Sequence, residues 1–224
     1  MRYVTAIVYM HKITTNMLIF FIIVITLWSV WGFFGSRVEQ ADYTVVKVMK
    51  GYEIREYPEH IVAQTVVKGS YRRSLNSGFS IVAGYIFGGN TKKAKIAMTA
   101  PVVTQNSKDS SNMEKIAMTA PVVATVQGDL QVISFFMPRS YSLESLPTPN
   151  DSRVTIVKIP KKKFAVMSYS WYNSENRITS MQEKLLSALA RDKVSVEGSV
   201  AYAGYNAPGT PPWMIRNEVM VELK

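Results

Sequence analysis

Side chains that could act as general acids, nucleophiles or metal ligands are few in this chain of 224 residues. There is no cysteine, so thiolate catalysis, disulfides and cysteine-bound zinc are excluded. The two histidines are His11 and His60. His60 follows a proline break at Pro58, where a lone histidine is ordinarily a surface residue; a ligand to iron is the alternative. No HExxH, GxSxG, GxxxxGK or GxGxxG motif occurs.

The carboxylates form no evident catalytic pair. Glu53 and Glu56 lie three residues apart in a predicted strand, so their side chains point to opposite faces and are poorly placed to act on one substrate. Binding without turnover is therefore the interpretation that these residues favour. An enzyme that uses Glu53, Glu56 or His60 as its acid or base is the alternative.

A nine-residue string, KIAMTAPVV, occurs at Lys95–Val103 and again at Lys115–Val123. The pattern predicts two successive antiparallel strands joined by a polar loop. The proline of each copy lacks a ladder donor and is expected at a strand end or bulge. Thr99 and Thr119 would be nucleophiles only beside a base, and none is indicated. The repeat therefore predicts architecture rather than catalysis.

The composition is that of a well-packed globular chain with a strong positive charge. Hydrophobic residues make up 47%, charged residues 19%, and the net charge is +10. Arg2 and Lys12 are the only formally charged side chains before residue 36, so most of the excess lies in the remainder. Lipid headgroups and carboxylate-bearing small molecules are suitable partners. No nucleic-acid partner is expected, because no motif combines aromatic and basic residues.

The segment Met17–Phe34 is uncharged and almost wholly apolar. Its eighteen residues would form a helix of about 27 Å, which is enough to cross a hydrocarbon core. Trp28 and Trp31 lie near its far end, where tryptophan favours the membrane interface. This pattern predicts one transmembrane helix that acts as an uncleaved signal-anchor. A cleaved signal peptide is the alternative, although no clean small-residue cleavage site follows.

The positive-inside rule places the N-terminus in the cytoplasm and the following domain on the periplasmic or extracytoplasmic side of the membrane. We expect four parts: a short cytoplasmic segment (1–16), the transmembrane signal-anchor (17–35), a linker (36–42) and an exported domain (43–224).

The exported domain shows one pattern used twice. Tyr52–Ala63 aligns with Val154–Ala165 at an offset of 102 residues, and each reads as a strand, a proline break and a second strand. A helix is expected after each pair, over Ser70–Phe87 and after Ser174, from apolar residues spaced by three and four. The further predicted strands are Gln131–Met137, Ser199–Tyr205 and Asn217–Leu223. The offset of 102 places the second KIAMTAPVV copy opposite the closing strand.

Two segments are apolar enough to form a binding surface. The first helix carries apolar residues over more than one stripe, so one face is expected to pack on the sheet and another to meet a ligand, a partner or a membrane. Core packing on both faces is the alternative. The loop Asn206–Ile215, NAPGTPPWMI, is stiff and apolar and would close over a flat ligand. The basic residues expected at the rim of this site, where carboxylates would bind, are Arg72, Arg73, Lys92, Lys93, Lys95 and Arg216.

Several motifs together resemble the SOUL heme-binding protein family. They are GYEIREYP, GYIFGGN, KIAMTAPV, FFMP and AGYNAPGTPPWMIRNEVMVEL, in that order along residues 43–224. The resemblance implies an α+β fold in which two pseudo-symmetric halves, each with one long helix, form a distorted antiparallel β-barrel. It also implies non-covalent, non-catalytic binding of heme or a related tetrapyrrole. A different amphipathic small molecule or lipid is the alternative ligand.

The resemblance places the heme between the first helix and the loop before the last strand. The residues that occupy those positions here are Leu75, Phe79, Val82, Ala83, Ile86, Trp213 and Met214. The axial ligand to iron is left open, since Glu56 stands where some relatives have a histidine.

Overall fold

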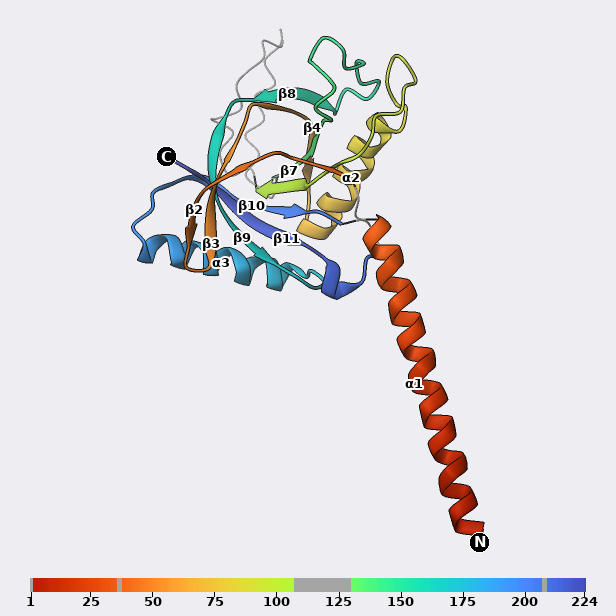
Figure 1. The fold of residues 1–224 in the computed structure, drawn as a ribbon. Helices are drawn as coiled ribbons and strands as arrows, with labels where there is room; N and C mark the ends of the chain where they lie inside the picture. The colour runs from red at the N-terminus through yellow and green to blue at the C-terminus, as the bar shows by residue number, and fades with distance from the viewer. Residues whose placement is uncertain (1, 36–37, 107–129, 207–208) are drawn as a thin grey trace.

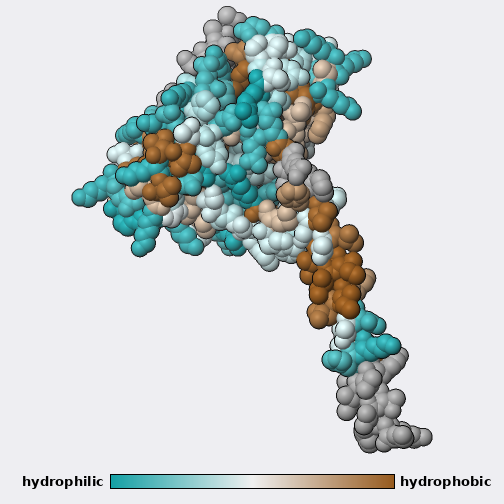
Figure 2. Space-filling model, viewed as in Figure 1, coloured by the Kyte–Doolittle hydropathy of each residue, from teal (hydrophilic) through white to brown (hydrophobic). Residues whose placement is uncertain are grey.

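The computed structural model describes residues 2–35, 38–106, 130–206 and 209–224. Within these residues, an α+β domain is preceded by one long helix, α1 (Arg2–Gly35), that projects away from it (Figure 1). The domain has two further α-helices, α2 (Tyr71–Ile86) and α3 (Glu175–Arg191), and a short 3₁₀ helix, η1 (Pro212–Met214). The middle of α1 is uniformly apolar on its surface, whereas the domain is mostly polar in the same view (Figure 2).

Most strands of the domain belong to one large sheet. Its strands are β2 (Thr44–Met49), β3 (Tyr52–Tyr57), β4 (His60–Lys68), β6 (Val102–Asn106), β7 (Leu130–Phe136), β8 (Thr155–Ile159), β9 (Lys162–Tyr169), β10 (Val196–Gly204) and β11 (Asn217–Leu223). They are antiparallel throughout, in the order β2-β3-β9-β11-β10-β6-β7-β4-β8. A separate two-stranded parallel ladder joins β1 (Glu39–Gln40), which lies in the expected linker, to β5 (Thr99–Ala100).

The strand order contains an internal twofold pattern. If β2 is set aside, exchanging β3 with β8, β4 with β9, β6 with β10 and β7 with β11 reproduces the same order in reverse. The partner of the closing strand β11 is therefore β7. The offset of 102 residues relates β3 to β8 and β4 to β9, as predicted. It does not extend to β11, because the two halves differ in loop length, so the predicted match of the second KIAMTAPVV copy with that strand is wrong. Among the described residues, β2 and β8 are the two edge strands of the large sheet and do not pair with each other. The closed barrel that was expected is therefore not shown.

The first KIAMTAPVV copy forms two short strands rather than one. Residues 95–98 lie outside any strand, β5 pairs with β1, and β6 begins only at Val102 in the large sheet. Pro101 separates the two strands, as expected of a residue without a ladder donor. The second copy lies outside the described residues.

The helices follow the predicted limits closely and each covers one half of the sheet. Ser174 accepts a hydrogen bond from the Arg177 amide at 3.2 Å, so the predicted N-cap of α3 is confirmed. The other helix, α2, packs on β4 and β7, whereas α3 packs on β9 and β11. Gly78 allows the close approach of α2, because a Cβ at that position would lie 2.7 Å from Cδ1 of Ile133.

Candidate functional site

The predicted ligand-facing side of α2 is buried in the protein core. Val82, Ala83 and Ile86 expose only 0%, 7% and 1% of their surfaces and pack with Ile133 and Phe135 of β7. These three side chains face the core of the domain rather than its surface. The cause is the large apolar surface of β4 and β7, which covers that face of the helix.

Leu75 and Phe79 differ from the three buried residues. Both are half-buried, and the Phe79 ring lies 5.1 Å from the ring of Phe135, centroid to centroid. They lie four residues apart, so they share one face of α2, and the exposed Arg72 precedes Leu75 by one turn on that face. Together these residues form a short apolar strip with a cation at its N-terminal end. We call Arg72, Leu75 and Phe79 the α2 strip.

A shallow groove of about 360 Å³ lies beside the second half of α2. Its lining residues are Ser80, Ile81, Gly84, Tyr85, Gly89, Asn150, Asp151 and Arg153. Arg153 binds Asp151 at 2.7 Å, and its guanidinium lowers the pKa of that carboxyl to about 2. The groove has a mixed lining, and sequence reasoning missed it because its two walls come from separate segments.

The loop that carries Trp213 and Met214 lies against α1. The Trp28 ring meets the Trp213 ring edge to face at 5.3 Å, and Trp28 Nε1 donates to the Gly209 carbonyl at 2.9 Å. Gly32 lies against Pro211 so closely that a Cβ there would overlap the proline ring. The loop was expected to close over a ligand on α2. In the structure it lies against α1 instead. Trp213 remains 44% exposed.

Five of the six expected rim cations are exposed, and one is not. Arg72, Arg73, Lys92, Lys93 and Lys95 are on the surface. Arg216 is instead committed to Glu218, with Nη2 to Oε1 at 2.7 Å and Nε to Oε1 at 3.0 Å. It also stacks over the Tyr205 ring at 4.0 Å. Arg216 is thus an internal partner rather than a rim charge for a ligand.

The carboxylate of Glu218 is the centre of a buried polar cluster that sequence reasoning missed. It is fully buried, and it accepts from Arg55 Nη1 (2.9 Å), Arg216 Nη2 (2.7 Å), Tyr205 Oη (2.7 Å) and Ser168 Oγ (3.0 Å). An acidic residue alternating with apolar ones in a predicted strand was the available signal. The paired charges indicate that this cluster is internally neutralised.

The electrostatics of this cluster favour its ionised form. Burial alone raises the pKa of Glu218, but the Tyr205 hydrogen bond and the charges of Arg216 and Arg55 outweigh it, so the pKa lies below its ordinary value. Burial and the Glu218 charge raise the pKa of Tyr205, which keeps the phenol protonated as a donor. Arg55 also binds Glu53 at 2.7 Å, so Glu53 too is engaged in an ion pair.

The other acid–base candidates are held in separate environments. Glu56 forms an ion pair with Lys161 at 2.7 Å. His60 Nδ1 donates to the Pro58 carbonyl at 2.8 Å, its ring stacks on Phe136 at 4.6 Å, and burial lowers its pKa. Its neighbour in β4, Ile61, faces α2, so His60 lies on the opposite face of the sheet. Within the described part of the chain, no group of three or more His, Cys, Asp or Glu residues could hold a metal ion.

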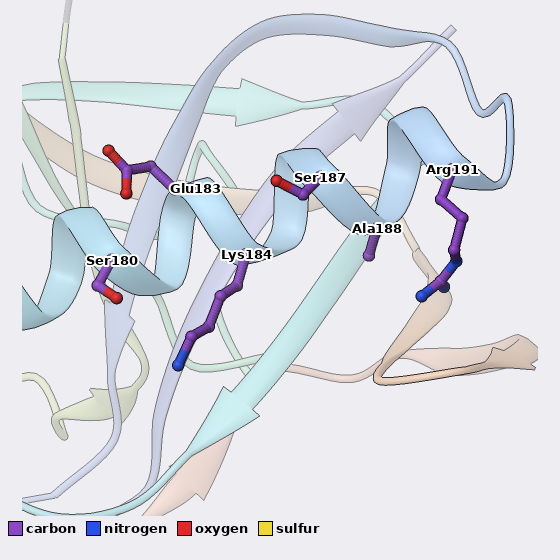
Figure 3. A pocket seen from close by; sticks show the side chains of 6 residues that line it. All are labelled: Ser180, Glu183, Lys184, Ser187, Ala188 and Arg191. Atoms are coloured by element: carbon purple, nitrogen blue, oxygen red, sulfur yellow. The ribbon is translucent and has the colours of Figure 1, made fainter.

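A second depression, of about 590 Å³, lies open on α3 (Figure 3). Its lining residues are Ser180, Glu183, Lys184, Ser187, Ala188 and Arg191. Glu183 points away from Lys184 in this view, and Arg191 binds Asp192 at 2.8 Å. The depression is shallow and mixed in charge, which is typical of a solvated helix face.

These features define an α+β domain in which an antiparallel sheet carries one helix on each half. The C-terminal domain of EcmrR has this fold: the two structures superpose with a TM-score of 0.53 at 10% identity, over 81% of this chain and 98% of that one. A structure of EcmrR bound to DNA gives a TM-score of 0.52 at 11% identity, over 79% of this chain and 59% of that one. At such identities the likeness shows the fold alone.

Sequence comparison is more specific. The model of the SOUL heme-binding protein family matches residues 38–114 and 106–222, so this chain belongs to that family. Heme-binding protein 2 of Homo sapiens is 29% identical over 159 residues, which cover 70% of this chain and 71% of that protein. Heme-binding protein 2 of Mus musculus is 28% identical over 182 residues, which cover 77% and 82%.

Proposed function

We propose that this protein binds heme or a related tetrapyrrole non-covalently, without turnover, on a domain tethered to a membrane. The observation that carries the proposal is the family match, which spans residues 38–222 and therefore almost the whole domain. Scavenging, buffering or transport of the ligand would all use such a site. The ion pairs of Glu53 and Glu56 and the separate position of His60 support binding rather than turnover.

The α2 strip is the part of the predicted site that fits a tetrapyrrole. Heme is flat and apolar with carboxylates at one edge. Leu75 and Phe79 offer partly exposed apolar surface, and Arg72 lies at the end of the strip, where it would meet a propionate by a charge-assisted hydrogen bond. Burial of Val82, Ala83 and Ile86 excludes them from contact unless the core opens. The heme iron would supply a Lewis-acidic, redox-active centre, and the strip would supply stacking and charge.

His60 is not part of this site. Its ring lies on the face of β4 opposite α2 and stacks on Phe136, so it is separated from the α2 strip by the sheet. An iron bound at the strip would therefore not be within reach of this imidazole. We accordingly base the affinity on apolar contact and rim charge.

Titration of hemin into the full chain in lipid nanodiscs tests the proposal. The Soret band should shift and sharpen with near 1:1 stoichiometry. Phe79→Asp should weaken binding by about tenfold or more, which corresponds to about 1.4 kcal/mol, because a charge replaces apolar contact. Arg72→Glu should weaken it several-fold without a change in folding, since Arg72 is exposed.

Phe87→Asp is the matched control. Phe87 directly follows α2, is 62% exposed and lies off the strip, so this variant should bind hemin as the wild type does. Wild-type affinity in both Phe79→Asp and Arg72→Glu would refute the site, and an unchanged Soret band in the wild type would refute heme binding itself. Mass spectrometry of the protein purified from its own membranes would reveal a different amphipathic ligand.

The helix α1 supports the membrane part of the proposal. Its stretch His11–Phe33, 23 residues, is long and apolar enough to cross a membrane, with a helical length of about 34 Å. We propose that it is an uncleaved signal-anchor with residues 1–16 in the cytoplasm and the domain from residue 43 on the extracytoplasmic side.

A further inference from the structure

All four tryptophans of the chain lie around one junction between α1 and the domain. Trp28 contacts Trp213 and Gly209, as described above. The Trp31 ring lies next to Gly209, where an added Cβ would be 3.0 Å from it. Trp171, in the loop between β9 and α3, donates its amide hydrogen to the Pro212 carbonyl at 3.1 Å. Two loops of the domain and the end of α1 therefore form one aromatic surface.

The contacts with α1 set the depth of these loops relative to a membrane. Trp28 precedes Phe33, the last residue of the apolar stretch, by five residues, or about 7.5 Å along the helix. The hydrogen bond from Trp28 to Gly209 places the loop at that same level. The polar interfacial layer of a bilayer is only about 5–8 Å thick on each side. If α1 spans the bilayer, the loop that holds Trp213 lies no farther from the bilayer centre than this layer.

Trp171 has an unusual backbone conformation that points to a contact outside the protein. Its φ is +85°, which is costly for a bulky side chain, on the order of 1–3 kcal/mol. Two hydrogen bonds hold it there, its own amide to Pro212 and the Asn217 Nδ2 group to its carbonyl at 2.8 Å. Yet its ring is 49% exposed and the adjacent Tyr172 is 53% exposed. The fold thus holds aromatic side chains outward at a cost in strain.

We propose that Trp171, Tyr172 and Trp213 form a membrane-docking face that sits in the lipid headgroup layer. Amphipathic aromatic rings are enriched at this depth. Arg177 supports the assignment: it is exposed, its Nη2 donates to the Ser170 carbonyl at 2.9 Å, and its guanidinium is placed beside the same loop, where it can meet a lipid phosphate. The inference rests on the proposed membrane span of α1.

Docking would change how the domain behaves on its tether. The domain would be held flat against the bilayer by three loop residues rather than moving freely on a linker. The loop with Trp213 and Met214 would then be a lipid contact, which explains why it does not cover α2. An apolar ligand could pass between the bilayer and the domain without crossing bulk water.

Fluorescence quenching by brominated lipid tests the docking face. The full chain is placed in nanodiscs of phosphatidylcholine brominated near the headgroup, with unbrominated nanodiscs for reference. One variant keeps only Trp171 and another keeps only Trp28, with the other tryptophans changed to Phe. We expect the retained Trp171 to lose as large a fraction of its emission as the retained Trp28.

The control replaces all four tryptophans by Phe and adds Phe87→Trp. Residue 87 follows the end of α2 that lies away from α1 (Figure 1). Quenching of Trp28 with no more quenching of Trp171 than of this control would overturn the docking face and leave the anchor intact. Absence of quenching at Trp28 would overturn the anchor, and the docking face with it.

A second measurement avoids multiple replacements. The chain has no cysteine, so Tyr172→Cys can carry a single nitroxide label. Docking predicts that the label is relaxed by lipid-soluble oxygen more than by a water-soluble nickel complex. The reverse order, with Trp28 quenched, would overturn the docking face.

Discussion

At the scale of single residues, Glu218 is the centre of a buried cluster of charged and polar side chains that stabilises the domain. Its carboxylate has no exposed surface and is neutralised by Arg55 and Arg216, with Tyr205 as a further donor. Removing one partner of such a cluster leaves the others as buried charges without compensation. The cluster joins β3, β9 and β11 and so stabilises this part of the sheet.

Glu218→Gln should destabilise the protein by about 3 kcal/mol, because it leaves two guanidinium groups partly uncompensated. Urea unfolding of the detergent-solubilised full chain measures this change. Glu222→Gln is the matched control on the same face of β11: Glu222 binds Lys162 at 2.7 Å near the surface, so its loss should cost less than about 1 kcal/mol. Equal effects of the two variants would contradict the assigned role of the cluster.

The same residue predicts a pH dependence. The folded-state pKa of Glu218 lies below its unfolded value, so its contribution to stability is present above the unfolded pKa of about 4.3 and is lost as the pH falls through the folded pKa. The difference in unfolding free energy between wild type and Glu218→Gln should stay at about 3 kcal/mol from pH 6 to 8. It should shrink below about pH 4. A difference that grows on acidification would contradict the lowered pKa.

At the scale of elements, α2 shows that predicting a helix is easier than predicting which of its faces is buried. Its limits were predicted from spacing, and so was its apolar character. The burial of part of its apolar face was not predicted: Val82, Ala83 and Ile86 pack against strands β4 and β7. Whether an apolar helix face is covered depends on a sheet assembled from distant segments, and no local pattern reports that.

Two glycines of α2 provide a prediction with its own control. Gly78→Ala should destabilise the domain by about 1 kcal/mol, because overpacking against Ile133 costs more than the gain in helix propensity. Gly84→Ala should instead stabilise it by up to about 1 kcal/mol, since nothing lies within 4 Å of the added Cβ. Thermal or urea unfolding measures both, and stabilisation by Gly78→Ala would show that α2 is not closely docked on β7.

At the scale of the whole molecule, α1 and the twofold-patterned domain act as two linked parts. Their contact is specific, since Gly32 and Gly209 permit approaches that larger residues would block. The junction brings the aromatic loops to the level at which a bilayer would end.

Alkaline carbonate extraction tests the anchor. The full chain should stay with the membranes, whereas Ile23→Lys combined with Leu27→Lys should release it or block insertion, since each lysine costs about 3 kcal/mol at the centre of a span. The conservative pair Ile23→Leu and Leu27→Ile should behave as the wild type. Release of the wild-type chain by carbonate would contradict a spanning helix.

Periodicity, capping residues and the duplicated pattern were sufficient to predict the helices and most strands, and the family resemblance supplied the α+β class. These signals are local: a helix face or a strand alternation can be read within a few turns of chain. The motifs were likewise sufficient to place the chain in its family. The predicted polar loop between the two KIAMTAPVV copies begins too early, since residues 104–106 belong to β6. The rest of that loop and the second copy lie outside the described residues, so that part of the prediction stays open.

The position of the loop with Trp213, the fate of Arg216 and the burial of α2 required the folded structure. Each depends on which distant segment lies opposite: α1 for Trp213, Glu218 for Arg216, and the β4–β7 pair for α2. Apolar character is a property of a residue, but burial is a property of its neighbours. Residue types and spacing thus predict which side chains are able to bind, and three-dimensional packing selects those that are free to do so.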